Sequence, residues 1–333
     1  MDKQIIETLG KKLIKQKPLV DKISISEYDP SDVAPPFKSM EWRGFPIYYD
    51  DIEHLYFTVQ KDVRIPLLST TTIWGLFEKP FDEKGMSEYC AQKGSYDCNC
   101  LDKKDWDSLD VKRKATRIRR AWKKNNKEAT DYGSAAHEVL EMAAKHPELT
   151  DKEIITQISY TSGKRAVRPI VKTFLKNFRP LLQKYIDAGF EVVAEPLLVL
   201  LEFGIAGQAD LVLIHHGRKE IVLLDYKTNK RKPSEEDAFG FMLEPFHSYP
   251  DGALTHYSLQ QATYGEMLKS MYPGYALRSM NLLWLNPESG DIEPVEIPMY
   301  WTLTVREYLQ EFKGRGILSG AYDMMKRKFK MSA

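Results

Sequence analysis

Two apolar runs joined by a short turn constrain the fold of this 333-residue chain more than any other feature. They are LVLI at 211–214 and IVLL at 221–224, with Gly217 and Arg218 between them. Continuous apolar runs are typical of strands that are buried on both faces. A glycine followed by one more residue suits a two-residue hairpin turn. The sequence therefore predicts a β-hairpin inside the core.

Helical and strand patterns surround this hairpin. The apolar spacing predicts helices and strands in the following order: helices over 111–130, 133–145 and 166–188, three strands over 191–203, 204–214 and 220–228, a helix over 256–270, strands within 280–297 and a helix over 303–313. This order indicates an α/β (α+β) fold, in which helices pack on a sheet. We expect 111–333 to form the core, and 1–110 to form an extension with a helix, a β-hairpin at 45–68 and an irregular segment at 82–110.

Composition excludes several classes of protein. The chain is 43% hydrophobic and 29% charged, as in ordinary globular proteins, so disorder over most of its length is excluded. It has neither an apolar stretch long enough to span a membrane nor a secretory signal, so we expect no membrane partner and a cytoplasmic location. Three cysteines, Cys90, Cys98 and Cys100, argue against a disulfide framework. The net charge of +1 leaves nucleic-acid binding to local patches.

The hairpin register places two aspartates opposite each other. If Gly217 and Arg218 form the turn, opposite residues have numbers that sum to 435, so Asp210 faces Asp225 and Gln208 faces Lys227. Two carboxylates about 5 Å apart repel each other unless a cation compensates them, and Mg²⁺ prefers such oxygens. Lys227 lies on the same strand face as Asp225, where it could orient or deprotonate a water or stabilise a developing negative charge. The alternative is a surface hairpin with scattered charges.

A second candidate group lies on the helix expected over 133–145. Gly133, His137 and Glu141 recur at steps of four residues, so they share one helical face. His137 can supply an imidazole to a metal ion, and Glu141 can orient another group. A solvated histidine and glutamate on a helix surface would show the same pattern.

Gln260 and Tyr264 form a third pair, four residues apart on the helix expected over 256–270. An amide and a phenol could hold a phosphodiester or stack near a base. Packing of this helix against the sheet explains the same residues equally well.

These residues form four short motifs in a fixed order. The motifs are Gly133…His137…Glu141, Gly207-Gln-Ala-Asp210, Asp225-Tyr-Lys227 and Gln260…Tyr264. Each is weak alone, but the ordered set resembles the RecB-like and phage-type exonuclease branch of the PD-(D/E)XK nuclease superfamily. The resemblance covers about 130–285 and implies a restriction-endonuclease-like core, with a central mixed β-sheet flanked by helices.

The resemblance also implies site chemistry. Asp210, Asp225 and the backbone carbonyl of Tyr226 would bind Mg²⁺ or Mn²⁺, and His137 would be a further ligand. Lys227 would be the catalytic lysine, with Glu141 assisting. Gln260 and Tyr264 would orient the substrate, and Glu195 could add a carboxylate. The iron–sulfur branch needs four cysteines, some of them C-terminal, so no iron–sulfur cluster is expected.

The function implied is metal-dependent hydrolysis of DNA phosphodiester bonds by an exonuclease that acts in DNA recombination, repair or phage DNA processing. A phage-encoded enzyme would work in the host cytoplasm. A homo-oligomer or a recombination or replication partner protein would be compatible with this role. An inactive DNA-binding module and an endonuclease are the alternatives.

The expected helix over 111–130 is strongly basic. Residues 111–124 hold eight lysines and arginines and no acid. We expect Arg117, Arg120 and Lys124, spaced on one helical face, to contact DNA phosphates. A solvated charged surface is the alternative.

Overall fold

The computed structural model describes residues 37–50, 54–60, 63–94, 100–158, 171–314 and 318. The helix expected near the N-terminus and Cys98 lie outside these residues.

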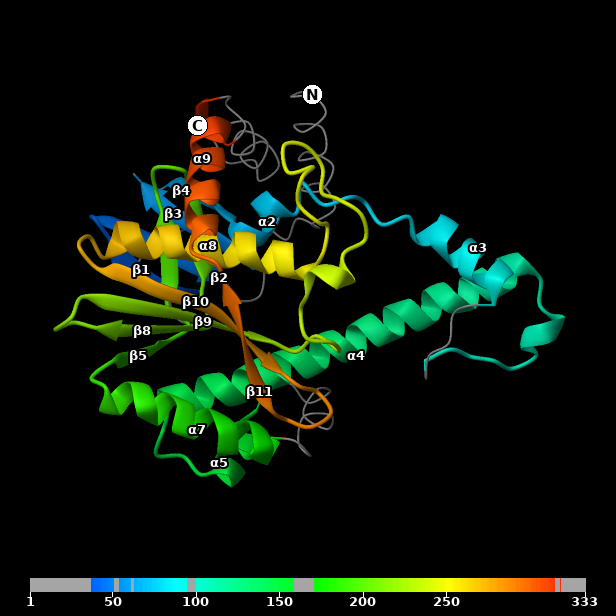
Figure 1. Cartoon of the computed structure of the whole chain (residues 1–333), viewed down its shortest axis with the longest axis horizontal. Coiled ribbons are helices and arrows are strands. Elements are labelled where there is room, and N and C mark those ends of the chain that lie inside the picture. The colour runs from blue at the N-terminus through cyan, green and yellow to red at the C-terminus, as the bar shows by residue number, and fades with distance from the viewer. Residues whose placement is uncertain are drawn as a thin grey trace.

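The strands form two mixed sheets (Figure 1). The five-stranded sheet has the order β11 (Ile292–Ile297), β10 (Ala276–Leu285), β9 (Glu220–Lys227), β8 (Leu211–His215) and β5 (Glu191–Ala194). The six-stranded sheet has the order β1 (Phe37–Trp42), β2 (Phe45–Asp50), β3 (Leu55–Gln60), β4 (Val63–Ser69), β7 (Ile205–Gln208) and β6 (Leu197–Leu200). Strands β9 and β10 pair in parallel, as do β4 and β7, whereas the remaining pairs are antiparallel.

Helices cover both faces of the five-stranded sheet. Side chains of α4 (Val111–Lys145), α5 (Asp151–Gln157) and α7 (Val171–Asp187) pack on one face. Those of α2 (Thr70–Trp74), α8 (Ala253–Met271) and α9 (Tyr300–Gly314) join the core on the other face. Mixed sheets flanked by helices confirm the predicted fold class, although the core holds two sheets rather than one. None of the described helices is long and apolar enough to cross a membrane.

The hairpin of β8 and β9 has the predicted register. Its ladder closes with the pair His215 and Glu220, and these numbers sum to 435 as expected. The turn itself differs from the prediction, because four residues separate the closing pair and Lys219, not Gly217, has the positive φ of 52°. A longer loop with one left-handed residue therefore preserves the same register.

The hairpin ladder ends at the pair Leu211 and Leu224, one step before the two aspartates. The predicted pairing of Gln208 with Lys227 is wrong, because Gln208 belongs to β7 and pairs with Leu197 of β6. The chain bends at Ala209 and Asp210 and passes from one sheet to the other. Residues 191–227 consequently form five strands, where the sequence suggested three.

Helix α4 is one continuous element, so the two separate helices expected at 111–130 and 133–145 are incorrect. Gly133 lies inside it, at a cost of only about 1 kcal/mol relative to alanine. The glycine has a local reason, since a Cβ atom there would lie 3.0 Å from the hydroxyl oxygen of Thr228. Helix α4 thus passes close to the end of β9.

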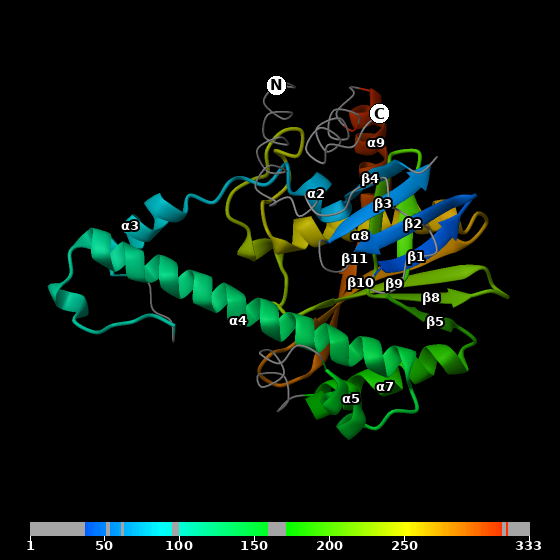
Figure 2. The same ribbon diagram turned by 180° about the vertical axis from the view of Figure 1, so that it is seen from behind.

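The first half of α4 extends away from the sheets together with α3 (Glu83–Lys93), as Figures 1 and 2 show. We call this part, residues 83–94 and 100–124, the arm. The helix α3 corrects the expectation of an irregular segment at 82–110, with Asp82 as N-cap and left-handed Gly94 as C-cap. The arm has a small apolar core of its own, made by Ala91, Leu101, Ala115, Ile118 and Ala121.

The N-terminal strands are part of the larger body. Strand β4 pairs in parallel with β7 through Leu68 and Ser69, so β1 to β4 share one sheet with strands from the middle of the chain. The division of the chain into 1–110 and 111–333 stays a prediction.

Gly207 packs directly under the ring of Tyr264 from α8. A Cβ atom at residue 207 would lie 2.4 Å from Cε1 of Tyr264, closer than two carbon atoms can approach. The glycine of the Gly207-Gln-Ala-Asp210 motif therefore permits the contact between β7 and α8.

We predict that Gly207→Ala destabilises the fold by about 1–3 kcal/mol, because the added methyl group overpacks a rigid contact. Urea denaturation checks the change. Gly314→Ala is the matched control, since a Cβ atom there meets nothing within 4 Å. Equal stability of both variants would contradict the close packing of Gly207 and Tyr264.

Candidate active site

Asp225 and Lys227 form a contact ion pair at the end of β9. The Asp225 side chain is 3% exposed and that of Lys227 is 13% exposed, so both charges are largely removed from water. The Lys227 ammonium also lies 4.6 Å from the ring centroid of Tyr257 on α8. Alternation along the strand places the aspartate and the lysine on one face, as the sequence predicted.

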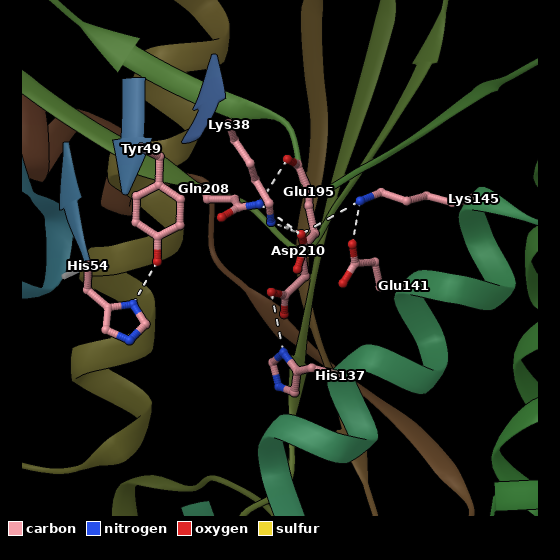
Figure 3. A network of polar contacts seen from close by, with 9 residues as sticks. All are labelled: Lys38, Tyr49, His54, His137, Glu141, Lys145, Glu195, Gln208 and Asp210. Carbon is pink, nitrogen blue, oxygen red and sulfur yellow. Dashed lines mark hydrogen bonds and ion pairs between the residues drawn. The ribbon is translucent and has the colours of Figure 1, made fainter. Parts of the chain in front are cut away.

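Asp210 joins this pair from the bend between the two sheets. Its Oδ2 accepts a hydrogen bond of 2.6 Å from the backbone N–H of Tyr226, which lies between the two charged residues of β9. Its Oδ1 lies 3.5 Å from Nδ1 of His137 on α4 (Figure 3). The structure therefore brings together four predicted residues: His137, Asp210, Asp225 and Lys227.

Charge interactions shift the pKa values within this group. Burial raises the pKa of Asp225 to about 6, although the Lys227 ammonium opposes the shift. Burial works against the charged form of Lys227, but attraction by Asp225 and Asp210 outweighs it and raises the lysine pKa. Burial likewise opposes ionisation of Asp210, yet the His137 imidazole and Lys227 hold the pKa of this carboxyl below its usual value.

His137 shows the complementary effect. Burial disfavours its charged form, but the Asp210 carboxylate prevails and raises the pKa of the imidazole. The ring of Tyr226 meets the His137 ring edge to face, with 5.6 Å between centroids, and packs in the same way on Phe178. This buried tyrosine ring helps to orient the histidine, while its backbone N–H orients Asp210.

Glu141 lies one turn beyond His137 and belongs to a neighbouring polar network (Figure 3). It pairs with Lys145, whose ammonium lies 3.7 Å from Oε2 of Glu195. Burial raises the pKa of Glu141, and the nearby Glu195 adds to the shift, whereas Lys145 opposes it. The structure thus places Glu141 beside the central group of four, in contact with other charges.

Glu195 links this network to both sheets. It has a positive φ of 51°, and its backbone N–H donates to the carbonyl of Asp210. Its carboxylate accepts a hydrogen bond of 2.9 Å from Gln208 and pairs with Lys38 of β1. The sequence analysis missed Lys38, which is separated from Glu195 by 157 positions and carries no local signal.

Gln260 and Tyr264 contact each other as their spacing predicted. Nε2 of Gln260 lies 3.1 Å from the hydroxyl oxygen of Tyr264, which also accepts a hydrogen bond from Thr70. Tyr264 is only 3% exposed, and burial raises its pKa to about 12, so it keeps its proton. Tyr264 packs against Gly207 of β7, and the role of both residues in substrate binding stays a prediction.

The three arginine and lysine residues expected to bind phosphate lie on the arm. Arg117 is 3.7 Å from Asp102 and donates to the carbonyls of Asp102 and Lys104. Lys124 lies 3.9 Å from Glu128, whereas Arg120 is exposed. Arg117 therefore fastens the loop before α4, and phosphate binding by all three residues stays a prediction.

In the described residues, no three His, Cys, Asp or Glu side chains already form a group that could hold a metal ion. Two carboxylates, the partly exposed Asp210 and the buried Asp225, are nevertheless neighbours in one charged group. Asp225 Oδ2 is fully buried, and the ammonium of Lys227 is the group that faces it. Oxygen donors of this kind suit Mg²⁺ or Mn²⁺. A cation between the two carboxylates would offset their mutual repulsion and the cost of burying their charge.

Comparison with known families identifies the class. The family model described as the PD-(D/E)XK nuclease superfamily matches residues 112–323, well over half of the chain. The chain therefore belongs to this nuclease superfamily, whose members hydrolyse phosphodiester bonds and generally use divalent metal ions.

A solved structure from Eubacterium rectale, named "Putative exonuclease", is also similar. It is 12% identical, with a TM-score of 0.36 over 59% of this chain and 68% of that one. The comparison with curated proteins returned no match.

We predict opposite stability changes for the two aspartates in the presence of a chelator. Asp225 has a raised pKa in the folded state, so its ionisation destabilises the fold at pH 8, and this cost disappears as the pH falls below about 4. Asp225→Asn should therefore stabilise the protein at pH 8, by about 1–3 kcal/mol, and have little effect near pH 4.

Asp210 has a lowered pKa, so its ionised form stabilises the fold above the unfolded pKa and this contribution is lost on acidification. Asp210→Asn should destabilise the protein at pH 8. Urea denaturation at both pH values checks the pair of variants, and a change of the same sign for both would contradict the electrostatic assignment.

Proposed function

We propose that this protein is a Mg²⁺- or Mn²⁺-dependent deoxyribonuclease that acts as an exonuclease. The observation that carries the proposal is the convergence of Asp210, Asp225 and Lys227 beside His137, in a chain of the PD-(D/E)XK nuclease superfamily.

The donor set fits a divalent cation. Asp210 would supply carboxylate oxygens from the bend and Asp225 from β9, and the backbone carbonyl of Tyr226 would supply an oxygen donor between the charged residues of β9. His137 is close enough to Asp210 to complete the set or to hold that carboxylate in place. A bound cation would lower the pKa of a water and neutralise charge on the phosphate.

The protein's own residues would stabilise developing charge and orient the substrate. Lys227 keeps its ammonium form beside the carboxylates, so it can stabilise negative charge that develops on a phosphate. Asp210 is held by the Tyr226 N–H and cannot rotate freely. Glu141 would support His137 and the Lys145 network, while Gln260 and Tyr264 would orient the DNA.

Exonuclease action in recombination, repair or phage DNA processing follows from the resemblance of the four motifs to the RecB-like branch. An endonuclease would use the same four central residues, so the experiment must test whether cleavage requires a free DNA end.

We predict that Asp210→Asn weakens Mn²⁺ binding at least tenfold, because it removes an anionic oxygen from the donor set. Isothermal titration calorimetry measures the affinity without any cleavage assay. Asp251→Asn is a matched control, since Asp251 is also a shielded carboxylate paired with a histidine, His256, but lies outside this group. Unchanged Mn²⁺ affinity in Asp210→Asn would remove Asp210 from the metal site.

We predict that Lys227→Met slows DNA cleavage by about 10²-fold or more while DNA affinity in Ca²⁺ stays near that of the unsubstituted protein. Methionine keeps the unbranched stem that packs at Tyr257 but lacks the charge. Cleavage is measured on end-labelled linear DNA and on covalently closed circular DNA, with and without Mg²⁺.

An exonuclease degrades only the linear DNA and needs the metal. Cleavage of the circle would identify an endonuclease. A protein that binds both substrates and cleaves neither would be an inactive binding module, and the proposed function would be wrong.

A further inference from the structure

Helix α4 connects the arm to His137 of the candidate site without interruption. Successive residues of an α-helix are rotated by about 100°, so positions spaced alternately by four and three lie along one line. Counting back from His137, this line contains Gly133, Thr130, Asn126, Lys123 and Arg119. We call these six residues the histidine edge of α4.

The histidine edge is polar and carries no acid. Lys123, Asn126 and Thr130 are exposed, and within the described residues no acidic group pairs with Lys123. Arg119, at the far end of the edge, donates to Ser87 of α3, which fixes the position of its guanidinium. A row of cationic, amide and hydroxyl groups is the set that proteins use to contact phosphates.

The acids of this part of α4 lie on the opposite side. Glu128 lies 3.9 Å from Lys124, and Asp131 lies 2.8 Å from Lys127. Arg117, Arg120 and Lys124 are rotated from His137 by roughly 100–160° about the helix axis. That side is therefore partly neutralised and points away from the catalytic histidine, whereas the histidine edge leads directly to it.

An exposed aromatic ring lies next to the histidine edge. Phe81, just before α3, is 67% exposed and packs edge to face on Trp122, with 5.5 Å between centroids. Trp122 immediately precedes Lys123 and is rotated by roughly 60° from the line of the edge. Cations beside an exposed ring form the combination that binds single-stranded nucleic acid, because the ring can stack on an unpaired base.

Resting on the proposed nuclease function, we propose that the histidine edge of α4 binds the phosphates of a single DNA strand, with Phe81 stacked on one of its bases, and guides that strand to His137. Lys123 lies about 21 Å from His137 along the helix, so the strand is held several nucleotides away from the bond that is cleaved. The substrate class follows from the stacking contact, since a base within a duplex cannot present its face to Phe81.

The test compares single substitutions by fluorescence anisotropy, in Ca²⁺ and at several salt concentrations, with a labelled single-stranded oligonucleotide and a fully paired duplex. Lys123→Gln should weaken single-strand binding and lower the slope of log affinity against log salt by about 0.7. Lys127→Gln, an exposed lysine one turn away that is paired with Asp131, is the matched control and should leave the slope unchanged. Phe81→Ala should weaken single-strand binding about fivefold or more and leave duplex binding unchanged.

The alternative is that the phosphates bind the other side of α4. It is tested by a triple variant in which glutamine replaces Arg117, Arg120 and Lys124. A loss of slope in this triple variant, with none in Lys123→Gln, places the phosphates on the other side of α4 and overturns the proposal. An equal effect of Phe81→Ala on single strands and duplexes also overturns it. Circular dichroism of each variant establishes that the arm remains folded.

Hydrolysis of bis(4-nitrophenyl) phosphate in Mn²⁺ separates this proposal from the function on which it rests. This diester is too small to reach the arm, so its hydrolysis by the unsubstituted protein tests the proposed metal site without the histidine edge. If the unsubstituted protein cleaves neither this diester nor DNA, the nuclease function fails. If it cleaves both and Lys123→Gln behaves as Lys127→Gln does, only the strand-binding edge fails.

Discussion

The hydrogen bond from the Tyr226 N–H to the Asp210 carboxylate is the interaction on which the site depends. The β8–β9 ladder ends one residue earlier, where the chain turns from one sheet to the other. Beyond that point the carboxylate takes the place of a ladder partner. The Asp210 side chain thus satisfies the backbone of β9, and the same hydrogen bond holds it next to Asp225 and Lys227. The break between the sheets and the candidate site therefore have the same origin.

Close contacts secure the elements around this bond. The Tyr264 ring rests on the bare backbone of Gly207, and α4 passes Thr228 at Gly133, so one glycine in β7 and one in α4 each permit a neighbour to approach. The Glu195 network adds a polar contact from β1 through Lys38. These contacts show why the N-terminal strands matter to a site whose ionisable side chains come from later in the chain.

Charge is concentrated where burial makes it costly. Asp225 is nearly inaccessible, and this burial raises its pKa even though Lys227 compensates much of its charge. Structures that retain such a destabilising group usually need it for function, because an apolar residue would pack at lower cost. The arm differs, because its charged side chains are mostly exposed to water. Its small apolar core is separate from the main core.

Local pattern in the sequence determined the hairpin register, the shared face of Asp225 and Lys227, and the helix that carries His137, because periods of two and about four residues are properties of the backbone. Tertiary structure decided what no local pattern records. The bend at Asp210 divided the expected strands between two sheets, and α4 runs without a break across the boundary expected between two helices. The pairing of Lys38 with Glu195 depends on residues far apart in the chain, so only the folded arrangement of the sheets could reveal it.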